Sequence, residues 1–245
     1  MKEQTIRTVW PQLFVKHVLV DIDGTIVYED CNYPDNFGVS VNYFLGILRD
    51  LMVKKHHLKP EAALTKILDC ESKFPEEYPY PRYLGIPERK VWTEIAKWQN
   101  KHLFVYPDAA RMIKRLYETG FTLYLASSNG KKAALSKLCR AGLSNLKRTK
   151  YFKDMFGGDV IRCGKTGPEY FASILAKTGF LPEDMVMIGD DAEMDLKNAK
   201  KAGIEKVIIV WRAQPEEVVL KENGGIYVRT LDVVPKLLFG TEPSR

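Results

Sequence analysis

Two carboxylates, Asp21 and Asp23, directly follow an apolar run and are themselves followed by Gly24 and Thr25. A buried strand that ends in this way places its carboxylates at the carboxyl edge of a sheet, where open α/β sheets bind ligands. Carboxylates this close can share a cation, or one can be a nucleophile while the other transfers protons. The alternative is a strand that ends in a solvated Asp-Gly turn.

Ser128 and Asn129 follow the apolar segment 121–126, and Lys165 stands shortly before a helical segment. A hydroxyl, an amide and backbone N–H groups at a helix N-terminus form an anion site, to which a lysine adds a point charge. The stretch around Lys165 is similar to the end of a P-loop, but Asp159 occupies the position of the required first glycine. An ordinary N-cap and a solvated lysine are the alternatives.

Asp190 and Asp191 follow a third apolar run, and Asp195 stands four residues further on. Acids clustered after a strand suit a hard cation such as Mg²⁺. They would also be favourable at the N-terminus of a helix without any metal, because the helix dipole attracts negative charge there.

The segments that must position these residues alternate between strand-like and helical patterns. We expect strands at Phe14–Asp21, Phe121–Ala126, Val160–Ile161, Met185–Ile188, Val207–Trp211 and Ile226–Val228. We expect helices at Asp108–Glu118, Lys131–Ala141, Pro168–Thr178, Ala192–Ala202 and Leu231–Leu238. This alternation predicts an α/β fold, a Rossmann-like parallel sheet with flanking helices.

The segment 31–103 has a different pattern, with helical spacing of apolar residues at Phe37–Lys55, Pro60–Phe74 and Glu88–His102. We therefore expect a helical insertion at 31–103, placed after the first strand of a core formed by 1–30 and 104–245.

Composition excludes several classes of protein. The 245 residues carry a net charge of +6, and no apolar run approaches the roughly 20 residues that span a membrane. The N-terminal residues have no apolar signal region, and four scattered cysteines fit reduced thiols, so we expect a cytoplasmic protein. Eight Lys or Arg and no acid lie between Lys131 and Lys153, but no aromatic interleaving accompanies them. A solvated helix is therefore favoured over a nucleic-acid surface.

Taken in order, the four groups resemble the four motifs of the haloacid dehalogenase-like (HAD) superfamily. The stretches that carry the resemblance are Asp21-x-Asp23-Gly24-Thr25, Ser128-Asn129, Lys165 with Pro168-Glu169, and Gly189-Asp190-Asp191 with Asp195. The resemblance covers about 14–30 and 104–238, and the helical insertion matches a C1-type cap. Thr166 departs from the pattern, since many relatives have proline there.

The resemblance implies a Mg²⁺-dependent phosphatase in which Asp21 attacks phosphorus and forms an aspartyl-phosphate. Asp23 would protonate the leaving oxygen and then activate water. The implied Mg²⁺ ligands are Asp21, the backbone carbonyl of Asp23, and Asp190, supported by Asp191 and Asp195. The implied phosphate-binding residues are Ser128, Asn129 and Lys165.

Asp23 separates several chemistries, because dehalogenase relatives lack this second acid. It favours hydrolysis of a small phosphorylated metabolite. A phosphomutase of sugar phosphates would use the same nucleophile and acid and is the alternative. A non-catalytic member of the superfamily would have no reason to keep acids that repel one another. The sequence leaves the substrate and the oligomeric state open.

Overall fold

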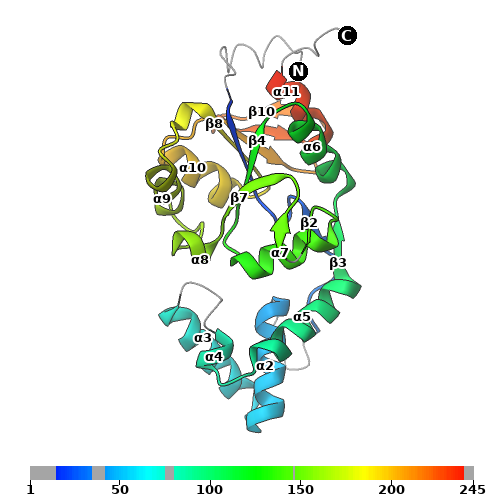
Figure 1. The fold of residues 1–245 in the computed structure, drawn as a ribbon, viewed down its shortest axis with the longest axis vertical. Coiled ribbons are helices and arrows are strands. Elements are labelled where there is room, and N and C mark those ends of the chain that lie inside the picture. Colours follow the sequence, from blue (N-terminus) through cyan, green and yellow to red (C-terminus); the bar gives the residue numbers. More distant parts are fainter. Residues whose placement is uncertain (1–14, 35–41, 75–79, 146, 240–245) are drawn as a thin grey trace.

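Strand β1 lies inside the central sheet, between β8 on one side and β4 on the other (Figure 1). The structure is a computed structural model that describes residues 15–34, 42–74, 80–145 and 147–239. The sheet order is β10-β11-β9-β8-β1-β4-β7, with only β10 antiparallel to its neighbour. The strands are β1 His17–Val20, β4 Thr122–Ala126, β7 Phe152–Phe156, β8 Met185–Gly189, β9 Val207–Val210, β10 Val218–Leu220 and β11 Ile226–Val228. From β1 the chain first adds β4 and β7 on one side and then β8 and β9 on the other, so the direction of strand order reverses at β1. Such a reversal opens a crevice outside the carboxyl ends of the strands.

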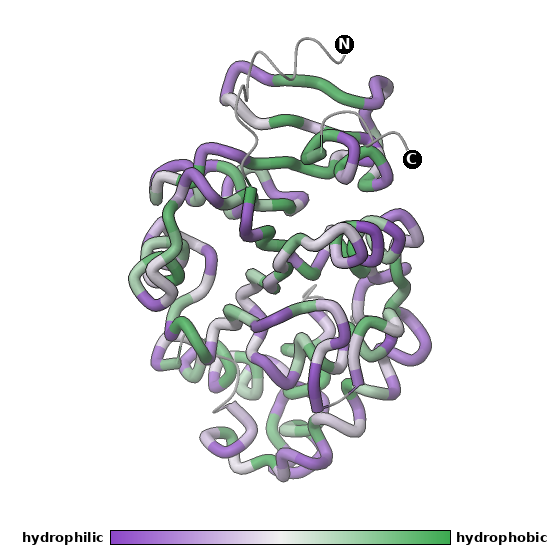
Figure 2. Tube along the Cα trace, turned by 45° about the horizontal axis from the view of Figure 1, so that its top comes forward, coloured by the Kyte–Doolittle hydropathy of each residue, from purple (hydrophilic) through white to green (hydrophobic). Residues whose placement is uncertain are grey.

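Helices cover both faces of the sheet, because successive residues of a strand point to opposite sides. On β1, Val18 and Val20 belong to one apolar cluster with α6, α7 and α11, whereas Leu19 belongs to another with α9, η2 and α10. Figure 2 shows hydrophobic residues concentrated along the extended segments of the sheet. The flanking elements are α6 Pro107–Glu118, α7 Lys131–Arg140, α8 Gly158–Ile161, α9 Glu169–Thr178, η2 Ala192–Lys197, α10 Asn198–Lys201, η3 Leu231–Val233 and α11 Val234–Phe239. The predicted α/β fold is confirmed.

A separate group of helices lies beyond the carboxyl edge of the sheet (Figure 1). This helical segment comprises α2 Tyr43–His56, α3 Pro60–Lys73, α4 Tyr80–Tyr83 and α5 Glu88–His102. Its apolar residues, Leu48 and Ile67 among them, pack on one another in a cluster of their own. The bounds expected for α5 agree with the structure, whereas positions 37–41 of the first expected helix lie outside the described residues.

Two short strands connect the helical segment to the rest of the chain. β2, Val27–Glu29, pairs antiparallel with β3, Leu103–Val105, so the outgoing and returning connections run side by side. The chain therefore enters and leaves the helical segment through two adjacent connections.

The strand predicted at Val160–Ile161 is wrong, because residues 158–161 form the short helix α8. The strand of this region is β7, which lies at the sheet edge and carries exposed Lys153 and Asp154 between buried Phe152 and Met155. An edge strand needs no continuous apolar run. The polar residues in the middle of β7 therefore removed the pattern by which a strand is predicted. The expected helix Ala192–Ala202 begins instead as the π-helical turn η2 and continues as α10.

Among the helices that the structure describes, none combines the length and the apolar composition that crossing a membrane would require.

The loop after β1 is fixed from the opposite side by Arg212, which follows β9. Its guanidinium donates to the backbone carbonyls of Gly24 and Thr25, at 2.9 and 3.1 Å, and to Asp108 at 3.2 Å. Buried Asp108 also accepts from the backbone N–H of Leu231, at 2.9 Å. Asp108 therefore connects the β1 loop to the C-terminal part of the core.

We expect Asp108→Ala to lower the free energy of unfolding by about 2–3 kcal/mol, because it leaves the backbone N–H of Leu231 without its acceptor and removes the carboxylate that pairs with the Arg212 guanidinium. Asp232→Ala is the matched control, since Asp232 pairs with Arg111 at 2.7 Å on the surface and should cost less than about 1 kcal/mol. Urea unfolding of both variants measures the difference. Equal losses would contradict the role assigned to Asp108.

Candidate active site

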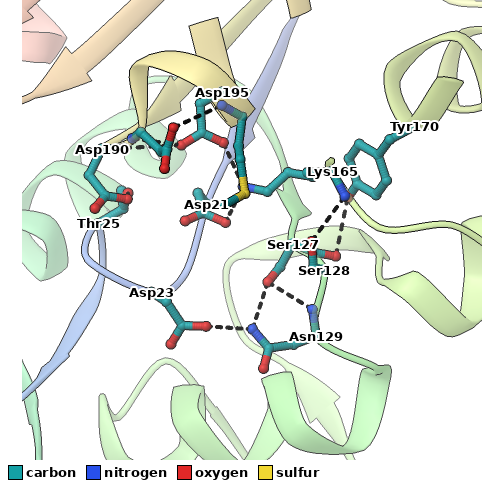
Figure 3. A network of polar contacts seen from close by, with 12 residues as sticks. Asp21, Asp23, Thr25, Ser127, Ser128, Asn129, Lys165, Tyr170, Asp190 and Asp195 are labelled. Atoms are coloured by element: carbon teal, nitrogen blue, oxygen red, sulfur yellow. Dashed lines mark hydrogen bonds and ion pairs between the residues drawn. The ribbon is translucent and has the colours of Figure 1, made fainter. Parts of the chain in front are cut away.

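Asp21 stands at the carboxyl end of β1, and its carboxylate is buried against Lys165 (Figure 3). The Lys165 ammonium lies 2.5 Å from Asp21 Oδ1 and 2.5 Å from Asp195 Oδ1. The backbone N–H of Asp21 donates to the carbonyl of Ile188 on β8, at 2.9 Å. The neighbouring strands β1 and β8, together with the loop before α9, therefore bring Asp21, Asp195 and Lys165 to one point.

The three acids after β8 have different roles. Asp195 Oδ2 accepts from the backbone N–H groups of Asp190 and Asp191, both at 3.1 Å. Asp191 caps η2 by accepting from the N–H groups of Glu193 and Met194, both at 2.8 Å. Asp190 accepts from the Thr25 hydroxyl at 3.2 Å. Asp190 thus faces the β1 loop, while Asp195 and Asp191 hold the loop that carries it.

Ligand atoms of Asp21, Asp190 and Asp195 all lie within 4.8 Å of one another, so these carboxylates could hold one metal ion. Burial raises the pKa of Asp21 well above its usual value; Lys165 opposes this effect, and the charges of Asp195 and Asp23 reinforce it. Withdrawal from water, together with the charge of Asp195, raises the pKa of Asp190 to about 6. Burial and the neighbouring acids therefore disfavour the ionised forms of Asp21 and Asp190, and a divalent cation bound among them would stabilise those forms.

The loop after β1 passes close to this cluster. Gly24 has φ = 72°, a left-handed conformation that glycine adopts without strain, and a Cβ placed there would lie 1.9 Å from Asp190 Oδ2. A side chain at position 24 would therefore displace Asp190. Glycine is the residue that lets the two loops approach.

Asp23 forms its ion pair with Lys137 of α7 and not with Lys165. The Lys137 ammonium lies 2.6 and 2.8 Å from the two carboxylate oxygens of Asp23, and Asn129 Nδ2 donates to the same carboxylate at 2.6 Å. Enclosure in the cleft tends to raise the pKa of Asp23, but the charge and hydrogen bonds of Lys137 and Asn129 outweigh it and lower the pKa.

The two serines after β4 lie differently (Figure 3). Buried Ser127 accepts from the backbone N–H and the side-chain amide of Asn129, at 3.2 and 2.8 Å. Exposed Ser128 accepts from the backbone N–H of Lys165, at 3.0 Å. Ser128 thus joins the second and third predicted groups, and Ser127 points its hydroxyl toward the Asp23–Asn129 pair.

A cavity of about 310 Å³ lies between the core and the helical segment. Asp23, Asn129 and Lys137 border it from the core. From the helical segment it is bordered by Asn42, Tyr43, Phe44, Trp92 and Ile95. This volume lies at the lower end of the range for small-molecule sites.

The helical segment contacts the helix that carries Lys137. Buried Gln99 of α5 accepts from the Ser136 hydroxyl of α7 at 2.6 Å, and donates to the Tyr43 hydroxyl of α2 at 3.0 Å. The Tyr43 ring lies 5.6 Å from the Lys137 ammonium. One turn of α7 therefore connects the cavity wall with the Asp23 ion pair.

The structure brings all eight predicted residues, from Asp21 to Asp195, to the carboxyl ends of β1, β4 and β8 or the loops beside them. Sequence reasoning missed Lys137, Ser127 and Gln99. Ser127 could have been found, since it is the first polar residue after an apolar run. Lys137 belongs to the basic stretch 131–153, in which one charge cannot be distinguished from another by spacing.

Comparisons with known proteins identify the family and the fold. A family model described as haloacid dehalogenase-like hydrolase matches residues 15–203. A phosphorylated carbohydrates phosphatase from Thermotoga maritima is 33% identical over 210 residues, which cover 85% of this chain and 91% of the relative. A phosphoglycolate phosphatase from Salmonella typhi is 30% identical over 149 residues, 60% of this chain but only 56% of that relative. A crystal structure of a HAD phosphatase from Thermococcus onnurineus superposes with a TM-score of 0.61 at 23% identity, covering 94% of this chain and 100% of that one, and so shows the same fold.

We expect Asp190→Asn to raise the melting temperature of the protein at pH 8 in chelator, because it removes a negative charge that burial and the neighbouring Asp195 disfavour. Since the pKa of Asp190 is raised to about 6, the gain should be full above that pH and shrink as the pH falls toward 4. Asp69→Asn is a control of opposite sign, because a hydrogen bond from Lys73 lowers the pKa of Asp69. The measurement is the change in melting temperature that the substitution causes at each pH. A change that is smaller at pH 8 than at pH 4.5 would contradict the raised pKa of Asp190.

Proposed function

Since the chain belongs to the haloacid dehalogenase-like hydrolases, we propose that it is a Mg²⁺-dependent phosphatase of a small phosphorylated metabolite. The observation that carries the proposal is the pair of acids after β1, each with its own lysine. Asp21 is held with Lys165 beside Asp190, whereas Asp23 is held with Lys137 beside the cavity. A nucleophile and a proton-transferring acid need such separate environments.

Mg²⁺ would be held by Asp21, Asp190 and the backbone carbonyl of Asp23. Asp191 and Asp195 would support it by holding the loop, as their hydrogen bonds to backbone N–H groups indicate. The bound cation would neutralise charge on the phosphate, which otherwise repels the attacking carboxylate.

The chain's own residues would perform two successive steps. In the first, an oxygen of Asp21 attacks phosphorus, the bond to the ester oxygen breaks, and Asp23 gives that oxygen a proton. In the second, Asp23 takes a proton from water, the water oxygen attacks phosphorus, and Asp21 is released as a carboxylate. Lys165 and the polar groups of Ser127, Ser128 and Asn129 would bind the phosphoryl oxygens.

Lys137 would set the protonation of Asp23 during these steps. A carboxyl group whose pKa is lowered is ionised near neutral pH, so it is in the form that can take a proton from water but holds no proton to give to a leaving oxygen. The negative charge of an arriving phosphate raises the pKa of a neighbouring carboxyl, so substrate binding would favour the proton that the first step needs.

We propose further that residues 31–103 act as a cap over a core of 1–30 and 104–245. Five residues of the helical segment border the cavity and could contact the part of the substrate that does not react. The paired connections β2 and β3 form the one described attachment about which this segment could move. Closure would exclude water and select the substrate.

The proposal predicts that the purified protein releases phosphate from an aryl phosphate and from a panel of small phosphorylated metabolites only with Mg²⁺ or a similar cation. Asp21→Asn should abolish turnover, because an amide cannot serve as this nucleophile. Asp23→Asn should slow it by about 10²-fold or more. Phosphate release at the normal rate from Asp21→Asn would refute the covalent step. Isomerisation of a sugar phosphate without phosphate release would identify a phosphomutase instead.

A second prediction concerns Lys137. Lys137→Met should raise the pKa of Asp23, so the part of the pH–rate profile that Asp23 sets should move to higher pH by about one pH unit or more. Lys132→Met is the matched control on the same helix, because Lys132 pairs with Glu88 at 2.6 Å and not with Asp23. Profiles of kcat and kcat/KM against pH distinguish the two. Identical profiles for both variants would show that Lys137 has no influence on Asp23.

A further inference from the structure

Three side chains with metal-binding chemistry meet where the helical segment joins the core. Asp30 and Cys31 follow β2, and His102 ends α5 just before β3. A carboxylate oxygen, the thiol sulfur and a ring nitrogen of these residues lie within 4.8 Å of one another. His102 Nδ1 is 3.1 Å from Cys31 Sγ and 2.9 Å from Asp30 Oδ1. The proposed phosphatase steps do not use these residues.

The backbone holds the three residues together independently of their side chains. The backbone N–H of Asp30 donates to the carbonyl of His102 at 3.1 Å, which continues the β2–β3 ladder by one step. The His102 ring lies against Trp98 of α5, with ring centroids 4.0 Å apart. The two connections therefore present the three donors from a fixed frame, and only short side chains need to adjust.

The arrangement does not fit a Cys-His-Asp catalytic relay. In such a relay the nucleophile and the carboxylate contact opposite nitrogens of the imidazole ring. Here Cys31 and Asp30 both approach Nδ1 of His102. Three ligand atoms that lie within 4.8 Å of one another can instead share a cation.

The distances suit a tetrahedral ion after a small adjustment. With Zn–S near 2.3 Å and Zn–N near 2.0–2.1 Å, neighbouring donor atoms in a tetrahedral site are about 3.4–3.6 Å apart. The observed separations are about half an ångström shorter, as expected for donors that hydrogen-bond without a metal. Asp30 and Cys31 are exposed, so their side chains have room to make this adjustment.

We propose that Asp30, Cys31 and His102 form a site for a thiophilic divalent cation of the Zn²⁺ class, with water in the fourth position. A thiolate, an imidazole and a carboxylate together favour Zn²⁺ over Mg²⁺, which prefers oxygen ligands. The bound ion joins the outgoing and the returning connection of the helical segment. By restraining these connections, the bound ion slows turnover. This second part of the proposal rests on the proposed function.

Titration with Co²⁺, a spectroscopic substitute for Zn²⁺, tests the site on the full chain under reducing conditions. We expect a thiolate-to-metal charge-transfer band. One equivalent of Zn²⁺ should abolish this band by displacing the Co²⁺. Cys31→Ser and His102→Asn should each remove it. Cys139→Ser, which alters another exposed cysteine, and Asp190→Asn, which alters the active-site cluster, should retain it. A band that survives Cys31→Ser, or no band at all, would overturn the site.

Turnover of an aryl phosphate at saturating Mg²⁺ tests the restraint. Zn²⁺ should inhibit the unmodified protein at concentrations about tenfold or more below those that inhibit Cys31→Ser, because loss of a ligand weakens the site. Equal inhibition of both would place the inhibition elsewhere and overturn the restraint. The binding titration needs no turnover, so failure of the phosphatase proposal would leave the result for the site intact.

Discussion

Electrostatic repulsion among four carboxylates that follow the neighbouring strands β1 and β8 is the constraint on which the rest of the site depends. Asp21, Asp23, Asp190 and Asp195 gather there, and burial strengthens the repulsion because little water separates the charges. Two buried lysines and the backbone N–H groups of the loop after β8 compensate part of it. The remaining charge is what would attract a divalent cation.

The two lysines come from different elements, and this separates the two acids chemically. Lys165 arises from the loop before α9 and is shared between Asp21 and Asp195. Lys137 arises from α7 and contacts Asp23. The pKa of one acid is therefore raised while that of its neighbour two residues away is lowered. Nearness in sequence does not give two carboxylates the same protonation.

Helix α7 connects this chemistry with the helical segment. It carries Lys137 toward Asp23 and, one residue earlier, Ser136 toward Gln99. Lys132 pairs with Glu88 of α5, and Arg140 donates to the backbone carbonyl of Asn100 at 3.0 Å. Part of the basic stretch 131–153 is thus explained by internal contacts. A movement of the helical segment would act directly on the helix that holds the counterion of Asp23.

The sequence predicted what depends on local pattern and missed what depends on distant contacts. Asp21, Asp190 and Lys165 could be recognised because each follows an apolar run or precedes a helix at a fixed spacing. β7 was missed because an edge strand tolerates Lys153 and Asp154, and Lys137 because its partner is 114 residues away in the chain. The assignment of the second group to Ser128 was incomplete, since Ser127 has the buried hydroxyl beside Asn129.

The fold alone does not decide which reaction this site performs, because one α/β scaffold can support several chemistries. The decision lies in the surroundings of position 23. A carboxylate there, with its own lysine and amide beside the cavity, is placed as the proposed proton transfer to a leaving oxygen requires. Without Lys137 the enclosure of this carboxyl in the cleft would be less opposed, and it would stay protonated to higher pH. The lysine on α7 is therefore what lowers the pKa of a second acid that stands two residues from the proposed nucleophile, whose own pKa is raised.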